Sequence, residues 1–426
     1  MSQMAGRAGQ IDHAAVAGPA VAEPPLEGSH VMNTYARAPI ALSYGRGVWV
    51  WDTAGRRYLD ALAGIAVSGL GHAHPRLTQA LAEQAGRIIH SSNLYQIPQQ
   101  EALADRLAAI SGMDKVFFCN SGCEANEAAL KLARLHGHAR GIDVPNVIVM
   151  EKAFHGRTLA TLSATGSRKV QAGFEPLVAG FVRVPYDDIE AVRQVGEHNP
   201  NVAAVLIEVI QGEGGINLVH DGYLEALRSI CDARGWLLML DEIQSGMGRT
   251  GKWFAHQHTG VKVDVMTLAK GLGSGVPIGA CLARGAAATL FKPGNHGTTF
   301  GGGPFACTAG LTTLAVIEND RLMENAVRIG DTIRRGLQQR LAGVAGVVEI
   351  RGKGLMLGLE LDRPCGELVQ QAIAVGLLIN VTADKVVRLL PALVMNEAEA
   401  EQLVDILSGL IRAFLQTGER NVAVKA

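Results

Sequence analysis

Runs of apolar, often β-branched residues alternate with helical patterns through the middle of this chain, and that alternation limits the folds open to it. The strand-like runs are KVFFC (115–119), NVIVM (146–150), GFVRVP (180–185), NVAAVLIEVI (201–210), WLLMLDEI (236–243) and VDVMTLA (263–269). Helical stretches such as GCEANEAALKLARLHG (122–137) separate them. Continuous apolar strands joined by helices predict a mainly parallel sheet that is covered on both faces.

The segments on either side of this region have a different character. The run GVWVWDTAGRRYLDAL (47–62) alternates apolar and polar residues around Thr53-Ala54-Gly55, which is a hairpin signal. Past residue 310, two long helical patterns, at about 304–342 and 396–416, surround short strand-like runs. Both segments therefore predict structure outside the main sheet.

These patterns predict an α/β protein of two domains with a leading extension. The large α/β domain is expected at residues 75–310. The smaller α+β domain is expected to combine residues 33–74 with residues 311–426. Residues 1–32 are rich in Ala, Gly and Pro and lack a long apolar core, so they predict a disordered extension and not a secretory signal.

Composition argues against several classes of protein. The 426 residues are 48% hydrophobic and 19% charged, with a formal net charge of −1, which argues against nucleic-acid binding. No apolar window reaches the roughly 18 uncharged residues that a membrane-spanning helix needs. The six cysteines show no C-x-x-C spacing, so neither a zinc site nor a disulfide framework is indicated. A cytoplasmic location is expected.

The carboxyl ends of the predicted strands carry the polar residues of interest, because ligands of open parallel sheets bind there. The first strand ends in Asn120-Ser121-Gly122-Cys123 and a helix begins at once. The unpaired N–H groups and positive dipole of a helix start suit a phosphate. An ordinary N-cap formed by Ser121 is the commoner use of such a sequence, and it stays open as an alternative.

Two further strand ends deliver charged residues of opposite sign. The run WLLML ends in Asp241, and the next strand ends in Lys270, within TLAKGLGSG (267–275). A buried carboxylate or ammonium is costly unless it is paired, neutralised or hydrogen-bonded. Asp241 and Lys270 therefore form either a buried salt bridge or part of a cofactor site.

Six motifs occur in the order and spacing of the class III aminotransferases. They are NSGCEAN (120–126), FHGRT (154–158), EVIQGEGG (208–215), DEIQSGMGRTG (241–251), AKG (269–271) and HGTTFGGGP (296–304). The resemblance extends from residue 33 to about residue 416. Within the family, GIAVSGLGHAHP (64–75) and HSSNLYQIPQQEALADRL (90–107) are most similar to the acetylornithine aminotransferase branch.

This resemblance implies a fold type I enzyme that depends on pyridoxal 5′-phosphate. Lys270 would form the internal Schiff base and, once displaced by substrate, move a proton from the substrate carbon to the cofactor. Its amine must then be neutral, and burial in a positively crowded site lowers the pKa of a lysine. Gly271 and Gly273 would leave room for the side chain to swing. Metal ligands are not implied.

The resemblance also assigns residues to the other parts of the cofactor. Asp241 would keep the pyridine nitrogen protonated, which tunes the ring as an electron acceptor. Gln244 would bond the ring hydroxyl and Phe154 would stack on the ring face. The start of the helix, Ser121, Gly122 and Cys123, would hold the phosphate. Relatives usually have Thr or Ala at the position of Cys123, whose backbone donor is unaffected by the change.

Substrate carboxylates would be bound by two arginines, since a guanidinium fits a carboxylate in bidentate fashion. Arg157 resembles the residue that grips the α-carboxylate of N-acetylornithine and the distal carboxylate of glutamate. Arg388 resembles the one that takes the α-carboxylate of glutamate. We expect Glu208 to pair with Arg388 when no substrate carboxylate is there. Tyr35 would close the pocket.

The loop HGTTFGGGP implies a shared site. In relatives, the residues at the positions of Thr298 and Thr299 reach the phosphate of the neighbouring subunit's cofactor and also touch substrate. We therefore expect a homodimer in which each site draws on both chains. Many relatives have Asn where this sequence has Gly303, so the path of this loop is the less constrained part of the resemblance.

The expected reaction moves the distal amino group of N2-acetyl-L-ornithine to 2-oxoglutarate, a step of arginine biosynthesis. Ornithine, N-succinylornithine and 4-aminobutyrate are alternative amino donors. A non-catalytic pyridoxal-binding protein on the same fold is an alternative of another class. A metal hydrolase built on the histidine pairs His72-Ala-His74 and His256-Gln-His258 is a further one, although two ligands without a third or fourth are weak evidence for zinc.

Overall fold

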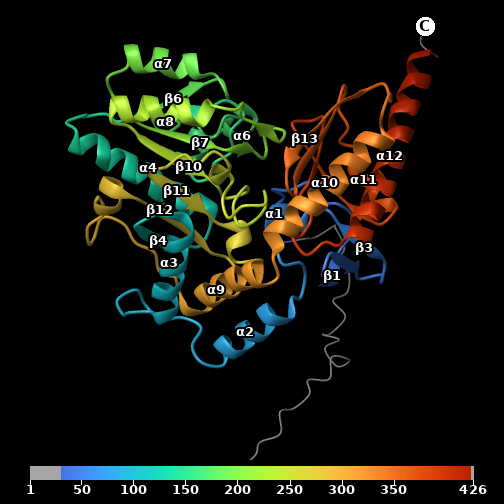
Figure 1. The fold of residues 1–426 in the computed structure, drawn as a ribbon, viewed down its shortest axis with the longest axis horizontal. Coiled ribbons are helices and arrows are strands. Elements are labelled where there is room, and N and C mark those ends of the chain that lie inside the picture. Colours follow the sequence, from blue (N-terminus) through green and yellow to red (C-terminus); the bar gives the residue numbers. More distant parts are fainter. Residues whose placement is uncertain (1–29, 424–426) are drawn as a thin grey trace, which may run out of the picture.

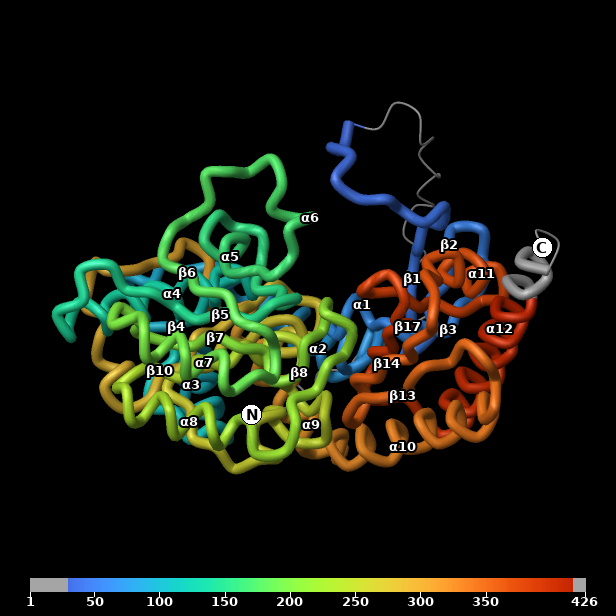
Figure 2. The backbone as a smooth tube through the Cα atoms, turned by 90° about the horizontal axis from the view of Figure 1, so that it is seen from above, coloured from blue at the N-terminus to red at the C-terminus, as the bar shows by residue number. Residues whose placement is uncertain are grey.

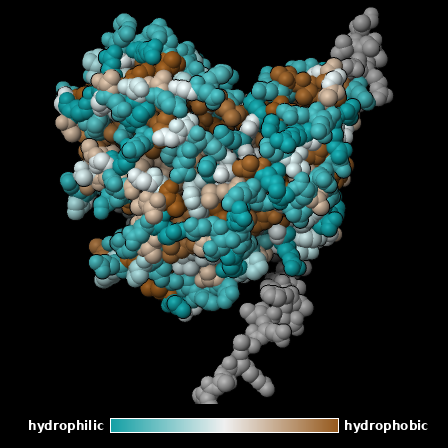
Figure 3. Space-filling model, in the orientation of Figure 1, coloured by the Kyte–Doolittle hydropathy of each residue, from teal (hydrophilic) through white to brown (hydrophobic). Residues whose placement is uncertain are grey.

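The computed structural model of the protein describes residues 30–423. Residues 1–29 of the expected N-terminal extension lie outside the described residues. The described chain forms one seven-stranded sheet and three smaller sheets, with helices packed around them (Figure 1). No helix in this part of the chain is both long and apolar enough to cross a membrane. Hydrophilic residues predominate on the face drawn in Figure 3, with apolar residues in small groups.

The large sheet has the strand order β4-β12-β11-β10-β7-β5-β6. Its strands are β4 (Lys115–Cys119), β5 (Asn146–Met150), β6 (Phe181–Val184), β7 (Val202–Glu208), β10 (Leu237–Asp241), β11 (Val265–Leu268) and β12 (Gly279–Ala283). β7, β10 and β11 pair in parallel, as do β5, β6 and β7, whereas β12 is antiparallel to both β11 and β4. The prediction of a mainly parallel sheet is confirmed. The sequence analysis missed β12, because its residues GACLA are mostly small.

Both faces of this sheet are buried, which explains the continuous apolar runs. Leu206 and Met239 point to one face and share a core with the apolar side of α4 (Gly122–Ala139). Ile207 points to the other face and shares a core with residues of α8 (Tyr223–Arg234). Because successive residues of a strand point to opposite faces, a strand covered on both sides carries few polar side chains before it ends.

Several helices around the sheet begin at recognisable sequence signals. α2 (Pro75–Ala85) and α3 (Pro98–Ser111) start with proline, whose missing N–H is not needed in the first turn. Asp188 caps α7 (Ile189–His198) by accepting the N–H of Ala191 at 3.0 Å. The shorter helices are α1 (Ala63–Ala66), α5 (Leu159–Ala164), α6 (Arg168–Gln171), η1 (Ala255–His258), η2 (Lys270–Leu272) and η3 (Gly285–Thr289).

The remaining elements bring the two ends of the chain together. β2 (Trp49–Asp52) and β3 (Arg57–Asp60) form the predicted hairpin, and β3 pairs in parallel with β15 (Leu377–Leu378). The other elements are β1 (Leu42–Arg46), β8 (Ile210–Gln211), β9 (Asn217–Leu218), β13 (Val347–Lys353), β14 (Met356–Leu361), β16 (Asn380–Thr382), β17 (Val386–Leu389), α11 (Leu368–Ala374) and α12 (Glu397–Ala423). Figure 2 shows the N-terminal strands lying among C-terminal elements, beside the large sheet. The division into domains at 75–310 and at 33–74 with 311–426 stays a prediction, and its boundary at residue 310 falls inside the helix α9 (Pro304–Asn319).

The long helical pattern at 304–342 forms two helices instead of one. α9 (Pro304–Asn319) ends before Asp320, and α10 (Leu322–Arg340) begins after Arg321, which has a φ of +53°. A left-handed residue cannot continue a right-handed helix, so the direction of the chain changes there. α9 therefore packs on α2 and α3, while α10 packs on β13 and α12.

Candidate active site

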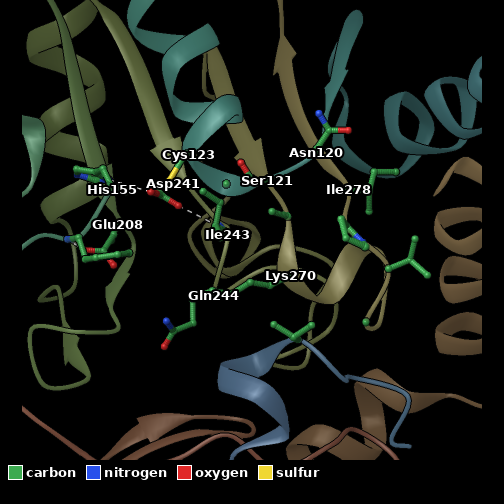
Figure 4. Close-up of a pocket in the computed structure, with 18 residues that line it drawn as sticks. Asn120, Ser121, Cys123, His155, Glu208, Asp241, Ile243, Gln244, Lys270 and Ile278 are labelled. Atoms are coloured by element: carbon green, nitrogen blue, oxygen red, sulfur yellow. Dashed lines mark hydrogen bonds and ion pairs between the residues drawn. The ribbon is translucent and has the colours of Figure 1, made fainter. Parts of the chain in front are cut away.

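A cavity of about 350 Å³ lies at the carboxyl ends of the strands of the large sheet (Figure 4). Charged residues enter it from three neighbouring strand ends: Glu208 from β7, Asp241 from β10 and Lys270 just after β11. The start of α4 and the loop after β5 supply further walls. This is the edge of the sheet at which a ligand was expected.

The carboxylate of Asp241 is held in place by three donors. Its Oδ2 accepts hydrogen bonds from Asn126 Nδ2 and from His155 Nδ1, both at 2.8 Å, and its Oδ1 accepts the backbone N–H of Ile243 at 3.0 Å. Asn126 is itself fixed, since its Oδ1 accepts the hydroxyl of Thr267 at 2.8 Å. These bonds offset the cost of burying the carboxylate. Asp241 therefore has a defined orientation toward the cavity.

Lys270 lines the cavity but is not ion-paired with Asp241. No carboxylate of the described residues forms an ion pair with its ammonium group, so the buried salt-bridge alternative is not what the structure shows. Lys270 begins η2 with a φ of +40°. Burial, together with the charge of Arg388, lowers the pKa of Lys270 to about 8, against the opposing effect of Glu213 and the other carboxylates.

The start of α4 is both an ordinary N-cap and part of the cavity wall. Ser121 is the N-cap, and its Oγ accepts the N–H of Glu124 at 3.3 Å. Ser121, Gly122 and Cys123 nevertheless line the cavity, and the first N–H groups of a helix have no partner within it. A Cβ on Gly122 would lie 2.8 Å from Ile243 Cδ1, so a larger residue would disturb this wall.

Phe154 and Arg157 belong to the loop after β5. Phe154 is half-buried and lines the cavity. The guanidinium carbon of Arg157 lies 5.6 Å from the centre of the Phe154 ring, while its backbone N–H donates to Cys123 Sγ at 3.3 Å. The side chain of Arg157 is exposed and does not line the cavity itself. It lies beside a residue of the cavity wall.

The expected pairing of Glu208 with Arg388 is wrong. Arg388 Nη1 instead forms an ion pair with Glu213 Oε1 at 2.6 Å and a hydrogen bond with Gln244 Oε1 at 3.3 Å, and its Nε donates to Asn380 Oδ1 at 3.1 Å. Nη2 is buried and has no partner among the described residues. Arg388 pairs with Glu213 because Glu213 lies in the loop after β8, which reaches toward Arg388 on β17. Glu208 is fixed at the end of β7 within the sheet.

Like Arg157 and Arg388, the predicted residues Tyr35, Thr298 and Thr299 do not line the cavity of the single chain. Tyr35 is 71% exposed and Thr299 is also exposed. Thr298 is half-buried, and its hydroxyl accepts hydrogen bonds from Asn120 Nδ2 at 3.3 Å and from the N–H of Gly301 at 3.1 Å. Gly303 is the N-cap of α9 with an ordinary φ of −64°, so its backbone conformation does not require glycine.

Three of the four histidines in the two pairs contact protein groups, whereas His74 Nδ1 is buried without a hydrogen-bond partner among the described residues. His72 Nε2 lies 2.8 Å from Asp60 Oδ2, His256 Nδ1 lies 3.0 Å from Glu242 Oε1, and His258 Nε2 lies 3.1 Å from the carbonyl of Thr250. Among residues 30–423, no three His, Cys, Asp or Glu side chains form a group that could hold a metal ion. The geometry therefore gives no support to the metal hydrolase alternative.

The sequence analysis missed three residues of the site. Asn126 and His155 orient Asp241, and Glu213 pairs with Arg388. All three lie inside motifs that were used for the resemblance, NSGCEAN, FHGRT and EVIQGEGG. A polar residue at the second turn of an otherwise apolar helix face was the available signal for Asn126.

Residues 31–411 of the chain match the model of the family described as aminotransferase class-III. The chain belongs to the class III aminotransferases. Enzymes of this family depend on pyridoxal 5′-phosphate. The match covers nearly all of the described residues, so the aminotransferase fold includes both the large sheet and the elements beside it.

Individual class III aminotransferases resemble the chain over almost its whole length. An acetylornithine aminotransferase of Nitrosomonas europaea is 62% identical over 389 residues, which cover 91% of this chain and 99% of that protein. Among solved structures, the ornithine aminotransferase of Toxoplasma gondii ME49 has a TM-score of 0.88 at 34% identity, covering 91% of this chain and 94% of that chain. The N-acetylornithine aminotransferase of Stenotrophomonas maltophilia K279a has a TM-score of 0.79 at 35% identity, with 90% and 98% covered.

We predict that the amine of Lys270 reacts as a lysine with a pKa of about 8. The neutral amine is the reactive form, so labelling of cofactor-free protein by acetic anhydride should reach half of its maximum near that pH. Competitive labelling against N-acetyl-lysine, whose amine titrates at about 10.4, followed by peptide mass spectrometry, measures it. If the labelling curves of Lys270 and of N-acetyl-lysine coincided, the cavity would not change the pKa of the Lys270 amine.

Proposed function

We propose that this class III aminotransferase moves the distal amino group of N2-acetyl-L-ornithine to 2-oxoglutarate, giving N-acetyl-glutamate semialdehyde and glutamate in arginine biosynthesis. The observation that carries the proposal is the convergence of Lys270, Asp241 and the start of α4 on one cavity. The choice of amino donor is supported by the 62% identity to the enzyme of Nitrosomonas europaea, an acetylornithine aminotransferase.

The residues of the cavity fit pyridoxal 5′-phosphate. The N–H groups of Gly122 and Cys123, at the positive end of the α4 dipole, suit its phosphate. Asp241 can accept a hydrogen bond from a protonated ring nitrogen, and Lys270 supplies the amine for covalent attachment. When bound, the cofactor supplies a ring that accepts electrons from the carbon that loses a proton.

We assign proton transfer to Lys270. With its pKa lowered to about 8, a useful fraction of Nζ is neutral near physiological pH and can accept a proton from the carbon that bears the amine. A Cβ at Gly273 would lie 2.1 Å from the carbonyl oxygen of Val276. The glycine lets the chain turn closely behind Lys270 and hold the amine at this wall.

Two arginines are proposed to bind the carboxylates of the substrates. Arg157 lies near the cavity wall and would take the α-carboxylate of N-acetylornithine and the distal carboxylate of glutamate. Arg388 would take the α-carboxylate of glutamate, for which its unpartnered Nη2 is available. Glu213 neutralises Arg388 when the substrate offers no carboxylate there, because an unpaired buried charge is costly.

Ornithine is the second candidate amino donor. The structure of an ornithine aminotransferase superimposes on this chain with a TM-score of 0.88, against 0.79 for an N-acetylornithine aminotransferase at similar identity. Overall superposition reflects the placement of the two domains as well as the pocket. Sequence identity of 62% to a whole relative is therefore the stronger support, and it favours N-acetylornithine.

The working unit is proposed to be a homodimer. Leu94, Tyr95 and Phe300 are between 66% and 87% exposed, and such a concentration of apolar residues marks an interface. Asn93 Nδ2 donates to the carbonyls of Thr298 and Gly301 at 3.2 and 3.1 Å, which joins the two exposed segments. Thr299 lies in the same patch, which supports a site shared between chains.

All six cysteines are free thiols, which supports the cytoplasmic location.

The amino donor can be identified by steady-state kinetics with 2-oxoglutarate as acceptor. We expect N-acetylornithine to exceed N-succinylornithine, ornithine and 4-aminobutyrate in kcat/KM by about tenfold or more, a difference that pocket contacts can supply.

Lys270→Ala should remain folded and lose more than about 10³-fold in turnover, whereas the exposed control Lys169→Ala should not. A preferred donor other than N-acetylornithine would contradict the substrate, and an active Lys270→Ala would contradict the mechanism.

The pairing of Glu213 with Arg388 predicts opposite effects in the two half-reactions. Glu213→Gln should slow the half-reaction with N-acetylornithine by about tenfold, because Arg388 is left without a counter-charge, and should leave the glutamate half-reaction nearly unchanged. Arg388→Lys should do the reverse, since bidentate geometry is lost. Single-turnover changes in cofactor absorbance separate the two. Equal losses in both half-reactions for Glu213→Gln would rule out this exchange of partners.

A shared site predicts complementation between inactive chains. Lys270→Ala and Thr299→Ala chains are each expected to be weakly active alone. In an equal mixture about half of the dimers should be heterodimers, and one of the two sites of each heterodimer is intact. The mixture should therefore recover about a quarter of wild-type activity. Mass spectrometry under native conditions measures the heterodimer fraction. If heterodimers form and activity stays at the level of the separate variants, Thr299 serves its own chain.

A further inference from the structure

Glu208 remains without a role once Glu213 is recognised as the partner of Arg388. It is the last residue of β7, and the sheet register places it directly beside Asp241 at the end of β10. Its side chain lines the cavity and is 6% exposed. No lysine or arginine of the described residues is paired with it. A buried carboxyl needs some other set of partners.

Those partners are backbone N–H groups of two different loops. Glu208 Oε2 accepts the N–H of Phe154 at 3.0 Å, and Glu208 Oε1 accepts the N–H of Gly212 at 3.2 Å. Phe154 belongs to the loop after β5 and Gly212 to the loop after β8. Each oxygen of one carboxyl group thus holds one loop.

Each of these loops carries a group proposed to act on a substrate carboxylate. Arg157 follows Phe154 by three residues, and Glu213 directly follows Gly212 and pairs with Arg388 at 2.6 Å. A Cβ on Gly212 would lie 2.4 Å from Gln244 Oε1, so the second loop is also packed closely on the cavity wall. A shift of either loop would change where a substrate carboxylate is bound.

We propose that the Glu208 carboxyl is a positioning group that ties the Phe154 loop to the Gly212 loop and so fixes the spacing between the two substrate-carboxylate sites. This inference rests on the proposed function for the roles of Arg157 and Glu213. Glu208 does not touch the reacting atoms in this assignment. It acts through the backbone of the two loops, and both half-reactions depend on it.

The tie depends on the protonation state of Glu208. The ionised carboxylate accepts both N–H groups, whereas a protonated carboxyl has one oxygen that carries a hydrogen and cannot accept equally well. Burial and the neighbouring Asp241 raise the pKa of Glu208 to about 7, against the effect of His155 and the two N–H groups. The other charged or titratable groups around it are Lys270, across the cavity, and Tyr186, whose hydroxyl donates to the Glu208 carbonyl at 3.2 Å. As the pH falls through this range, the tie should loosen.

Hydrogen exchange of the wild-type dimer with bound cofactor tests the tie without any variant. After correction for intrinsic rates, the segments that contain Phe154 and Gly212 should lose protection together as the pH is lowered from 8 to about 6, by about 3–10-fold, as for the loss of one hydrogen bond. The segment that contains Ala255 and His256, whose N–H groups donate to the buried Glu242 carboxyl at 2.9 and 2.8 Å, is the internal control. Protection that does not depend on pH in the first two segments would overturn the proposal.

Variants add a kinetic readout. In wild-type enzyme, kcat/KM of both half-reactions should fall on the acid side of about pH 7. In Glu208→Gln the step near pH 7 should disappear, so that only the dependence set by Lys270 near pH 8 is left. Both plateau values should be about 3–10-fold below those of the wild type, chiefly through KM. Glu208→Asp keeps the charge and should keep the acid limb. The matched control Glu242→Gln should lose thermal stability while retaining the wild-type shape of the pH profile.

The outcomes separate this inference from the proposed function. The exchange experiment needs no substrate, so a different amino donor would leave its result fully interpretable. An enzyme that is active on N-acetylornithine, with a step near pH 7 that persists in Glu208→Gln, would overturn the role of Glu208 alone. A selective loss in one half-reaction would also overturn it, because the tie holds both loops.

Discussion

The three hydrogen bonds that fix the Asp241 carboxylate are the constraint on which the rest of the site depends. They come from α4 through Asn126, from the loop after β5 through His155 and from the backbone of Ile243. A buried carboxylate that lost these donors would be strongly destabilised. The need to satisfy one charged group therefore holds the start of α4, the Phe154 loop and the end of β10 at fixed positions around the cavity.

The acidic residues around the cavity have different partners and therefore different roles. Asp241 is held by side-chain and backbone donors, Glu208 by two backbone N–H groups and Glu213 by Arg388. Burial and the charge of Arg388 lower the pKa of Lys270 to about 8, which suits an amine that must lose its proton to act. Asp241 and Glu208 are each held by several groups of the surrounding framework, whereas the ion pair of Glu213 with Arg388 is the contact that we propose a substrate carboxylate replaces.

Much of this arrangement could be predicted from the sequence, because apolar strands reveal where they end. Asp241 and Lys270 follow such strands, and their meeting at one edge follows from parallel pairing. The partner of Arg388 could not be found in this way. Glu208 and Glu213 are five residues apart in one motif, and the choice between them depends on the path of a loop, which hydrophobic periodicity does not describe. The strand β12 was missed for a related reason, because its small residues give little periodic signal. The roles of Tyr35 and Thr299 stay predictions, because neither residue lines the cavity of the single chain.

The central claim is that Lys270 is the residue that carries the cofactor in this cavity. The most direct measurement is reduction of the purified yellow enzyme with borohydride, followed by digestion and mass spectrometry of the peptides. The account predicts a single pyridoxyl-phosphate adduct, on Lys270 in the segment TLAKGLGSG. An adduct on another lysine, or reduction without any covalent adduct, would contradict it.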